Sequence, residues 1–155
     1  MTDTESGAVW RHRAADPGLV AFLPAGALRA PNGIACDGRR LLVAHASGVT
    51  VVTLGSGARA ELAVPAGSTL GGLDGLYVDR DVLLGVQNSF GSPRVVRAEL
   101  DAGHAAARRI TVLESMHPAL ETATTAALVR RDRKLLVLAR GNASPPVILS
   151  VPVDP

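Results

Sequence analysis

The sequence predicts an all-β fold, and three observations lead to this prediction. The aliphatic runs are short and rich in β-branched residues, which is typical of strands. Gly, Asp, Asn and Pro separate these runs, as expected for tight turns between strands. The sequence also repeats itself, because the phrase that begins at Asn32-Gly33-Ile34 returns at Asp74-Gly75-Leu76. Four short strands in each unit of about 40–45 residues are typical of a β-propeller blade, so we expect about three four-stranded blades.

The first strands lie in the N-terminal part of the chain. The segments GAVWRHR (7–13) and GLVAFL (18–23) are interpreted as two strands of an earlier unit. We expect residues 1–6 to be a disordered N-terminus and residues 7–155 to form a single, partial propeller domain. The first complete unit then has strands near 33–36, 41–46, 48–54 and 59–64.

Two further units follow. The second has strands near 75–79, 82–88, 94–100 and 107–113. A weaker third copy has strands near 125–130, 134–139 and 147–152. The run RVVRAEL alternates as a half-buried outer strand does, whereas LLVLA is apolar on both faces, as in a strand buried on both sides. Helical repeats are excluded, because no unit has an apolar period of 3.6 residues.

Composition excludes several classes of protein. The chain has 155 residues, a net charge of +2 and only four aromatic residues, which argues against a nucleic-acid partner. The only cysteine, Cys36, lies in an apolar run, so we expect a buried thiol and no disulfide framework. A secretory leader and a membrane-spanning run are both missing from the sequence, so we expect a cytoplasmic protein with no membrane partner.

Three stretches carry a resemblance to a known family. APNGIACDGRRLLVAHASG, LDGLYVDRDVLLGVQNSFGSPRVVRAEL and ATTAALVRRDRKLLVLARGNASPP resemble the C-terminal half of the SMP-30/gluconolactonase/LRE-like six-bladed propellers. The resemblance implies half of a six-bladed ring. It also implies a metal-dependent lactone or ester hydrolase with a divalent cation, Ca²⁺ or Zn²⁺, at the channel mouth. Asn32 and Asp74 match two of the family's metal ligands, while the third, a first-blade Glu, has no counterpart here.

The same positions can be argued from the repeat alone. Asn32, Asp74 and either Thr124 or Thr125 begin the innermost strands of successive blades, so they surround the channel mouth. Carboxylate and amide oxygens are ligands that Ca²⁺ prefers. Asp74 is either a ligand or the catalytic general base, and Asn32 is either a ligand or a residue that caps backbone amides. Loops opening on this face add His45, Asn88, His117 and Glu121 as neighbours.

Other polar residues receive structural interpretations. Asp37 and Asp79 lie at hairpin turns on the opposite face, so we expect them to be structural. His12 and His104 are expected at the surface.

Three hypotheses of function remain at this point. The first is a lactone hydrolase that acts on a sugar-like small molecule only when the ring is completed by oligomerisation, as a homodimer or with another subunit. The second is a non-catalytic propeller that binds a ligand or a protein. The third is a truncated, inactive homologue.

Overall fold

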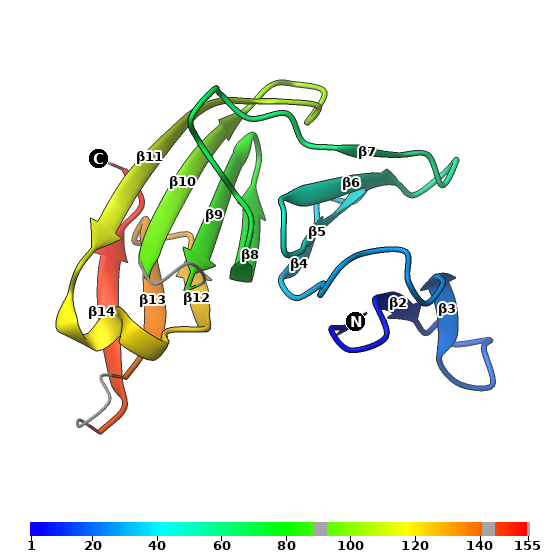
Figure 1. Cartoon of the computed structure of the whole chain (residues 1–155), viewed down its shortest axis with the longest axis horizontal. Coiled ribbons are helices and arrows are strands. Elements are labelled where there is room, and N and C mark those ends of the chain that lie inside the picture. Colours follow the sequence, from blue (N-terminus) through cyan, green and yellow to red (C-terminus); the bar gives the residue numbers. More distant parts are fainter. Residues whose placement is uncertain (89–92, 141–144, 155) are drawn as a thin grey trace.

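The computed structural model describes residues 1–88, 93–140 and 145–154 and consists of four antiparallel sheets. The sheets follow one another in chain order around an open arc, from the blue N-terminal strands to the red C-terminal strand (Figure 1). This arrangement confirms the all-β propeller prediction. Residues 141–144, between the second and third predicted strands of the third copy, lie outside the described part of the chain.

The first sheet has three strands, β1 (Thr2–Asp3), β2 (Ala8–Arg11) and β3 (Val20–Leu23). The prediction that residues 1–6 are disordered is wrong, because Thr2 pairs with Val9 and Asp3 pairs with Ala8. The carboxylate of Asp3 also accepts hydrogen bonds from the backbone and hydroxyl of Ser6, which closes the turn between β1 and β2. A two-residue strand has no apolar alternation, so its sequence carried no strand signal.

The second sheet is a complete blade of four strands. Its strands are β4 (Ile34–Cys36), β5 (Arg40–Ala44), β6 (Val49–Thr53) and β7 (Arg59–Glu61). All four lie within two residues of the predicted segments except β7, which ends at Glu61 rather than 64. Beyond that point Ala63 forms an isolated bridge with Ala106 of the next sheet, so the chain leaves its own blade early.

The third sheet is also complete, and it has the longest strands. They are β8 (Leu73–Asp79), β9 (Val82–Gln87), β10 (Arg94–Leu100) and β11 (Ala107–Ser115), paired in sequence order. Register shifts interrupt the β10–β11 pairing twice, between Val95 and Val96 and between Glu99 and Leu100.

The fourth sheet has three strands, β12 (Thr125–Val129), β13 (Lys134–Ala139) and β14 (Val147–Pro152). A short 3-10 helix, Pro118–Thr122, precedes it and was not predicted from the sequence. The described chain therefore contains two complete blades between two three-stranded sheets, where the sequence predicted about three blades.

In the complete blades the fourth strand leads to the innermost strand of the next sheet. The connection from β3 to β4 is of this kind, so β1–β3 correspond to strands two to four of a blade.

The core consists of three apolar layers, one between each pair of neighbouring sheets. Adjacent residues of one strand enter different layers: Leu83 packs toward the second sheet and Leu84 toward the fourth, and both are at most 1% exposed. Val96 and Val95 divide in the same way. Strands buried on both faces explain why the apolar runs of the third unit are continuous rather than alternating. No described helix is long and apolar enough to cross a membrane.

Ion pairs join neighbouring sheets at the hairpin turns. Asp79, the last residue of β8, accepts hydrogen bonds from the guanidinium groups of Arg130 and Arg133, in the turn between β12 and β13. Asp37, after β4, lies 3.0 Å from the Nδ1 atom of His104, whose Nε2 atom is 3.2 Å from Asp81. The structural interpretation of both aspartates is therefore confirmed.

Two expectations about exposure are wrong. His104 is only 3% exposed, because carboxylates from two different turns enclose its ring. Cys36 is exposed rather than buried, because it is the last residue of β4 and its Sγ atom faces the turn, where it accepts the backbone N–H of Gly38.

Candidate functional site

The centre of the candidate site is a pair of polar side chains from two different blades. Asn32 lies two residues before the first residue of β4, and Asp74 is the second residue of β8. Although 42 residues separate them, the Nδ2 atom of Asn32 donates a hydrogen bond of 2.7 Å to the Oδ1 atom of Asp74. The structure therefore brings the two repeat positions together at the start of the innermost strands. Asn32 is exposed and Asp74 is partly buried, so a small molecule can reach the pair.

The glycine after each polar residue allows this close approach. A Cβ atom on Gly33 would lie 2.8 Å from the Cβ of Leu76 and 3.0 Å from the carbonyl oxygen of Asp74. A Cβ on Gly75 would lie 3.3 Å from the carbonyl oxygen of Thr124 in the following sheet. Asn-Gly and Asp-Gly are therefore not turn dipeptides here. Their glycines let the backbones of neighbouring innermost strands pack closely.

Burial has the largest effect on the pKa of the Asp74 carboxyl. Desolvation raises the pKa of the Asp74 carboxyl above its ordinary value of 3.8. Hydrogen bonds from the side chains of Asn88 and Asn32 act in the opposite direction, because they stabilise the ionised form. The predicted neighbour Asn88 thus belongs to the site, and among the described residues the side chains that hydrogen-bond to the carboxylate are two amides.

The donor atoms of this site are of the type that a hard cation binds. Asp74, Asn32 and Asn88 offer only oxygen ligands, the type that Ca²⁺ binds, and they supply one negative charge. The Nδ2 atom of Asn32 faces the carboxylate, so this amide must turn to present its oxygen to a cation. In the described ranges, no group of three or more His, Cys, Asp or Glu residues could hold a metal ion.

The threonines of the fourth sheet lie next to this site but contribute differently. Thr124 approaches Gly75 through its backbone carbonyl. The Oγ1 atom of Thr125 is 3.2 Å from the hydroxyl of Tyr77, which also donates to the carbonyl of Ala126 and accepts from its N–H. Tyr77 was not among the predicted site residues. It joins the third and fourth sheets beside the rim.

The structure directs His45 away from the pair. His45 is 5% exposed, and its Nε2 atom lies 3.0 Å from Glu61 and 3.1 Å from the hydroxyl of Thr50. On the other side of the ring, the hydroxyl of Ser47 is 3.2 Å from Nδ1. These contacts all lie within the second blade. His45 therefore stabilises the β5–β6 hairpin and its outer strand.

His117 and Glu121 belong to the 3-10 helix that leads into the fourth sheet. His117 is the N-cap residue, and its Nδ1 atom accepts the backbone N–H of Ala119 at 3.1 Å. Glu121 lies in the first turn of the same helix and is exposed. The His117 hydrogen bond lies within this helix and does not involve Asn32 or Asp74.

Comparisons with known proteins identify the fold. No family model matches the sequence, and no curated protein matches it. Among solved structures, a chain of the nidogen/laminin complex aligns with a TM-score of 0.70 and 17% identity, over 89% of this chain and 51% of that chain. The PQQ-bound aldose sugar dehydrogenase from Streptomyces coelicolor aligns with a TM-score of 0.56 and 23% identity, over 72% of this chain and 38% of that one.

These matches are to β-propellers. The chain spans about half the length of the nidogen/laminin chain and less of the dehydrogenase. At these identities the likeness shows the fold alone. The chain therefore has a β-propeller fold, with its candidate site at the start of the innermost strands.

Proposed function

We propose that this chain is a gluconolactonase-like propeller protein whose rim binds a divalent cation and a small, sugar-like lactone or ester. The observation that carries the proposal is the 2.7 Å hydrogen bond between Asn32 and Asp74, which joins the innermost strands of two blades. These are the two positions at which the sequence resembles the family's metal ligands. Ca²⁺ and Zn²⁺ are the cations that the resemblance implies.

Asp74 is the residue that would bind the cation. Its partly buried carboxylate has no cationic side chain among its hydrogen-bond partners, so a divalent cation would remove an unfavourable desolvated charge. Hydrogen bonds from Asn32 and Asn88 would help to orient the carboxylate. When bound, the cation would polarise a lactone carbonyl and lower the pKa of an attacking water molecule.

The proposed hydrolase needs a complete channel. The four described sheets form an open arc, so one side of the channel mouth is not enclosed by them (Figure 1). We propose that a second copy, or another subunit, encloses the mouth and supplies the missing acidic ligand. A closed two-fold dimer is the simplest assembly of this kind.

A non-catalytic binding protein is the second candidate. The specific observation in its favour is that the site has one carboxylate and two amides. Such a group binds polar ligands by hydrogen bonds without any metal.

One set of measurements separates the two candidates. We expect light scattering of the purified protein to give a mass above 15.9 kDa for the hydrolase and calorimetric titration to show Ca²⁺ or Zn²⁺ binding. Asp74→Ala is expected to abolish both cation binding and the hydrolysis of a sugar lactone, because it removes the only carboxylate of the described site. Circular dichroism checks that the variant still folds.

Asp132→Ala is the matched control. Asp132 is exposed in the turn between β12 and β13, so its loss should leave cation binding and activity unchanged. Retained activity in Asp74→Ala would overturn the hydrolase. A ligand bound without any cation would support the second candidate instead.

A further inference from the structure

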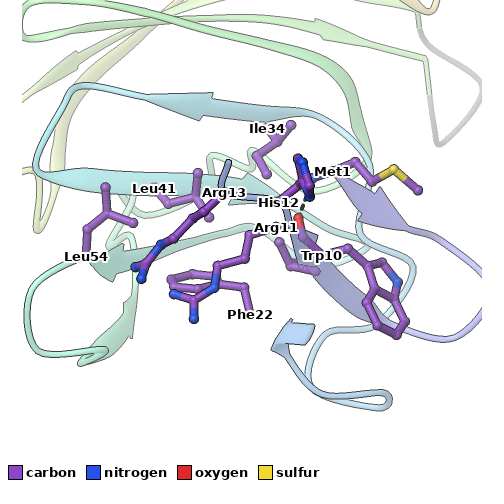
Figure 2. A pocket seen from close by; sticks show the side chains of 10 residues that line it. Met1, Trp10, Arg11, His12, Arg13, Phe22, Ile34, Leu41 and Leu54 are labelled. Atoms are coloured by element: carbon purple, nitrogen blue, oxygen red, sulfur yellow. Dashed lines mark hydrogen bonds between the residues drawn. The ribbon is translucent and has the colours of Figure 1, made fainter. Parts of the chain in front are cut away.

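A second site lies between the first and second sheets, in a pocket of about 420 Å³. Val9 and Phe22 form its wall on the first sheet, and Ile34, Leu41 and Leu54 form its wall on the second. Figure 2 shows these side chains around the pocket. The volume falls within the range of small-molecule pockets in proteins. Asn32, Asp74 and Asn88 do not line it, so it is distinct from the site at the rim.

Two arginines give the pocket its charge. Arg11 ends β2 and Arg13 follows two residues later, and both side chains line the pocket (Figure 2). The guanidinium carbon of Arg11 lies 6.0 Å from the centre of the Phe22 ring, a cation–π contact that holds the group over the apolar wall. The Nε atom of Arg11 is buried and has no hydrogen-bond partner in the described structure.

The positive charge has no counterpart in the pocket. None of the residues that line it is acidic. Asp16, three residues after Arg13, accepts the backbone N–H of Arg13 at 2.9 Å. Arg13 is exposed, whereas Arg11 is partly buried, and an anion would compensate the desolvated charge of Arg11. The pocket therefore combines an apolar wall with two guanidinium groups.

We propose that this pocket binds a monocarboxylate with an apolar body, such as a medium-chain fatty acid. The carboxylate accepts hydrogen bonds from Arg11 and Arg13, whose planar donors match its geometry. The hydrocarbon chain lies against Phe22, Leu41 and Leu54. Because Leu54 is 40% exposed and lies at the edge of the pocket, ligand binding would cover apolar surface that now faces water.

The test is calorimetric titration of the intact chain with octanoate and with octanamide, which has the same length and no charge. We expect octanoate to bind with a 1:1 stoichiometry and at least about tenfold more tightly than octanamide, because a charge-assisted hydrogen bond is stronger than a neutral one. Arg11→Gln is expected to weaken octanoate binding about tenfold or more and to leave octanamide binding nearly unchanged.

Two further variants complete the design. Arg13→Gln changes an exposed residue and should weaken octanoate binding even if Arg11→Gln proves unstable. Arg131→Gln, in an exposed turn of the fourth sheet, is the matched control and should bind as the wild type does. No octanoate binding, or equal affinity for octanoate and octanamide in the wild type, would overturn the proposal. An equal loss of octanoate affinity in Arg131→Gln would also overturn the proposal, because the effect would then reflect net charge alone.

Discussion

At the scale of single residues, Asp74 stands out because its surroundings disfavour its charge. Burial raises its pKa, and only two amide side chains oppose this effect. A carboxyl whose pKa is higher in the folded than in the unfolded protein binds more protons in the folded state. Stability is therefore lost as the pH rises from the ordinary value of 3.8 through the folded-state pKa.

The direction of this pH dependence predicts how the stability of Asp74→Asn differs from that of the wild type. The variant keeps an acceptor oxygen and removes the charge. We expect the variant to melt at a higher temperature than the wild type at pH 7. The difference should shrink as the pH falls toward and below 3.8, where Asp74 is neutral in both states. Thermal melts of both proteins between pH 3 and pH 8 measure this difference in melting temperature. A wild type that is the more stable protein at pH 7 would contradict this account of Asp74.

Single residues also show what the sequence could and could not predict. Asn32 and Asp74 were predicted as neighbours because the repeat places them at equivalent positions, and the structure joins them. The burial of His104 could not be predicted, because the two carboxylates that enclose it come from turns far away in the sequence. The pocket near Arg11 escaped prediction for the same reason, since its two walls belong to different sheets.

At the scale of elements, the strands were largely predictable and the shortest elements were not. β10, β13 and β14 have the predicted bounds, because each is an apolar or alternating run between turn residues. β1 and the 3-10 helix Pro118–Thr122 were missed. Both are too short for a periodic signal. Beside each of them a backbone N–H donates to a side chain, that of Ser6 to Asp3 and that of Ala119 to His117.

The contact between β4 and β8 leads to a prediction about Gly33. We expect Gly33→Ala to lower the free energy of unfolding by about 1–3 kcal/mol, because the new Cβ would lie 2.8 Å from the Cβ of Leu76 and 3.0 Å from the carbonyl oxygen of Asp74, and neither atom can move without its backbone. Urea unfolding measures the change.

Gly18→Ala is its control. A Cβ on Gly18 meets nothing within 4 Å, so this variant should be neutral or more stable by up to about 1 kcal/mol. Should Gly33→Ala be as stable as Gly18→Ala, the innermost strands would not be packed as described.

At the scale of the whole molecule, the four sheets share apolar layers with their neighbours and form an open arc (Figure 1). The radial arrangement explains how residues 42 positions apart meet at one rim. It also explains why ion pairs from the hairpin turns recur at successive interfaces on the opposite face. The repeat predicted this architecture, but it could not show how many strands each terminal sheet contains.

The most direct test of the central claim is a double-mutant cycle of Asn32→Ala and Asp74→Ala, measured by urea unfolding. The account states that blades arranged about an axis hold these two side chains in contact. It predicts that their effects on the free energy of unfolding are coupled by about 0.5–1.5 kcal/mol, the contribution of one hydrogen bond. Effects that add to within about 0.3 kcal/mol would contradict it.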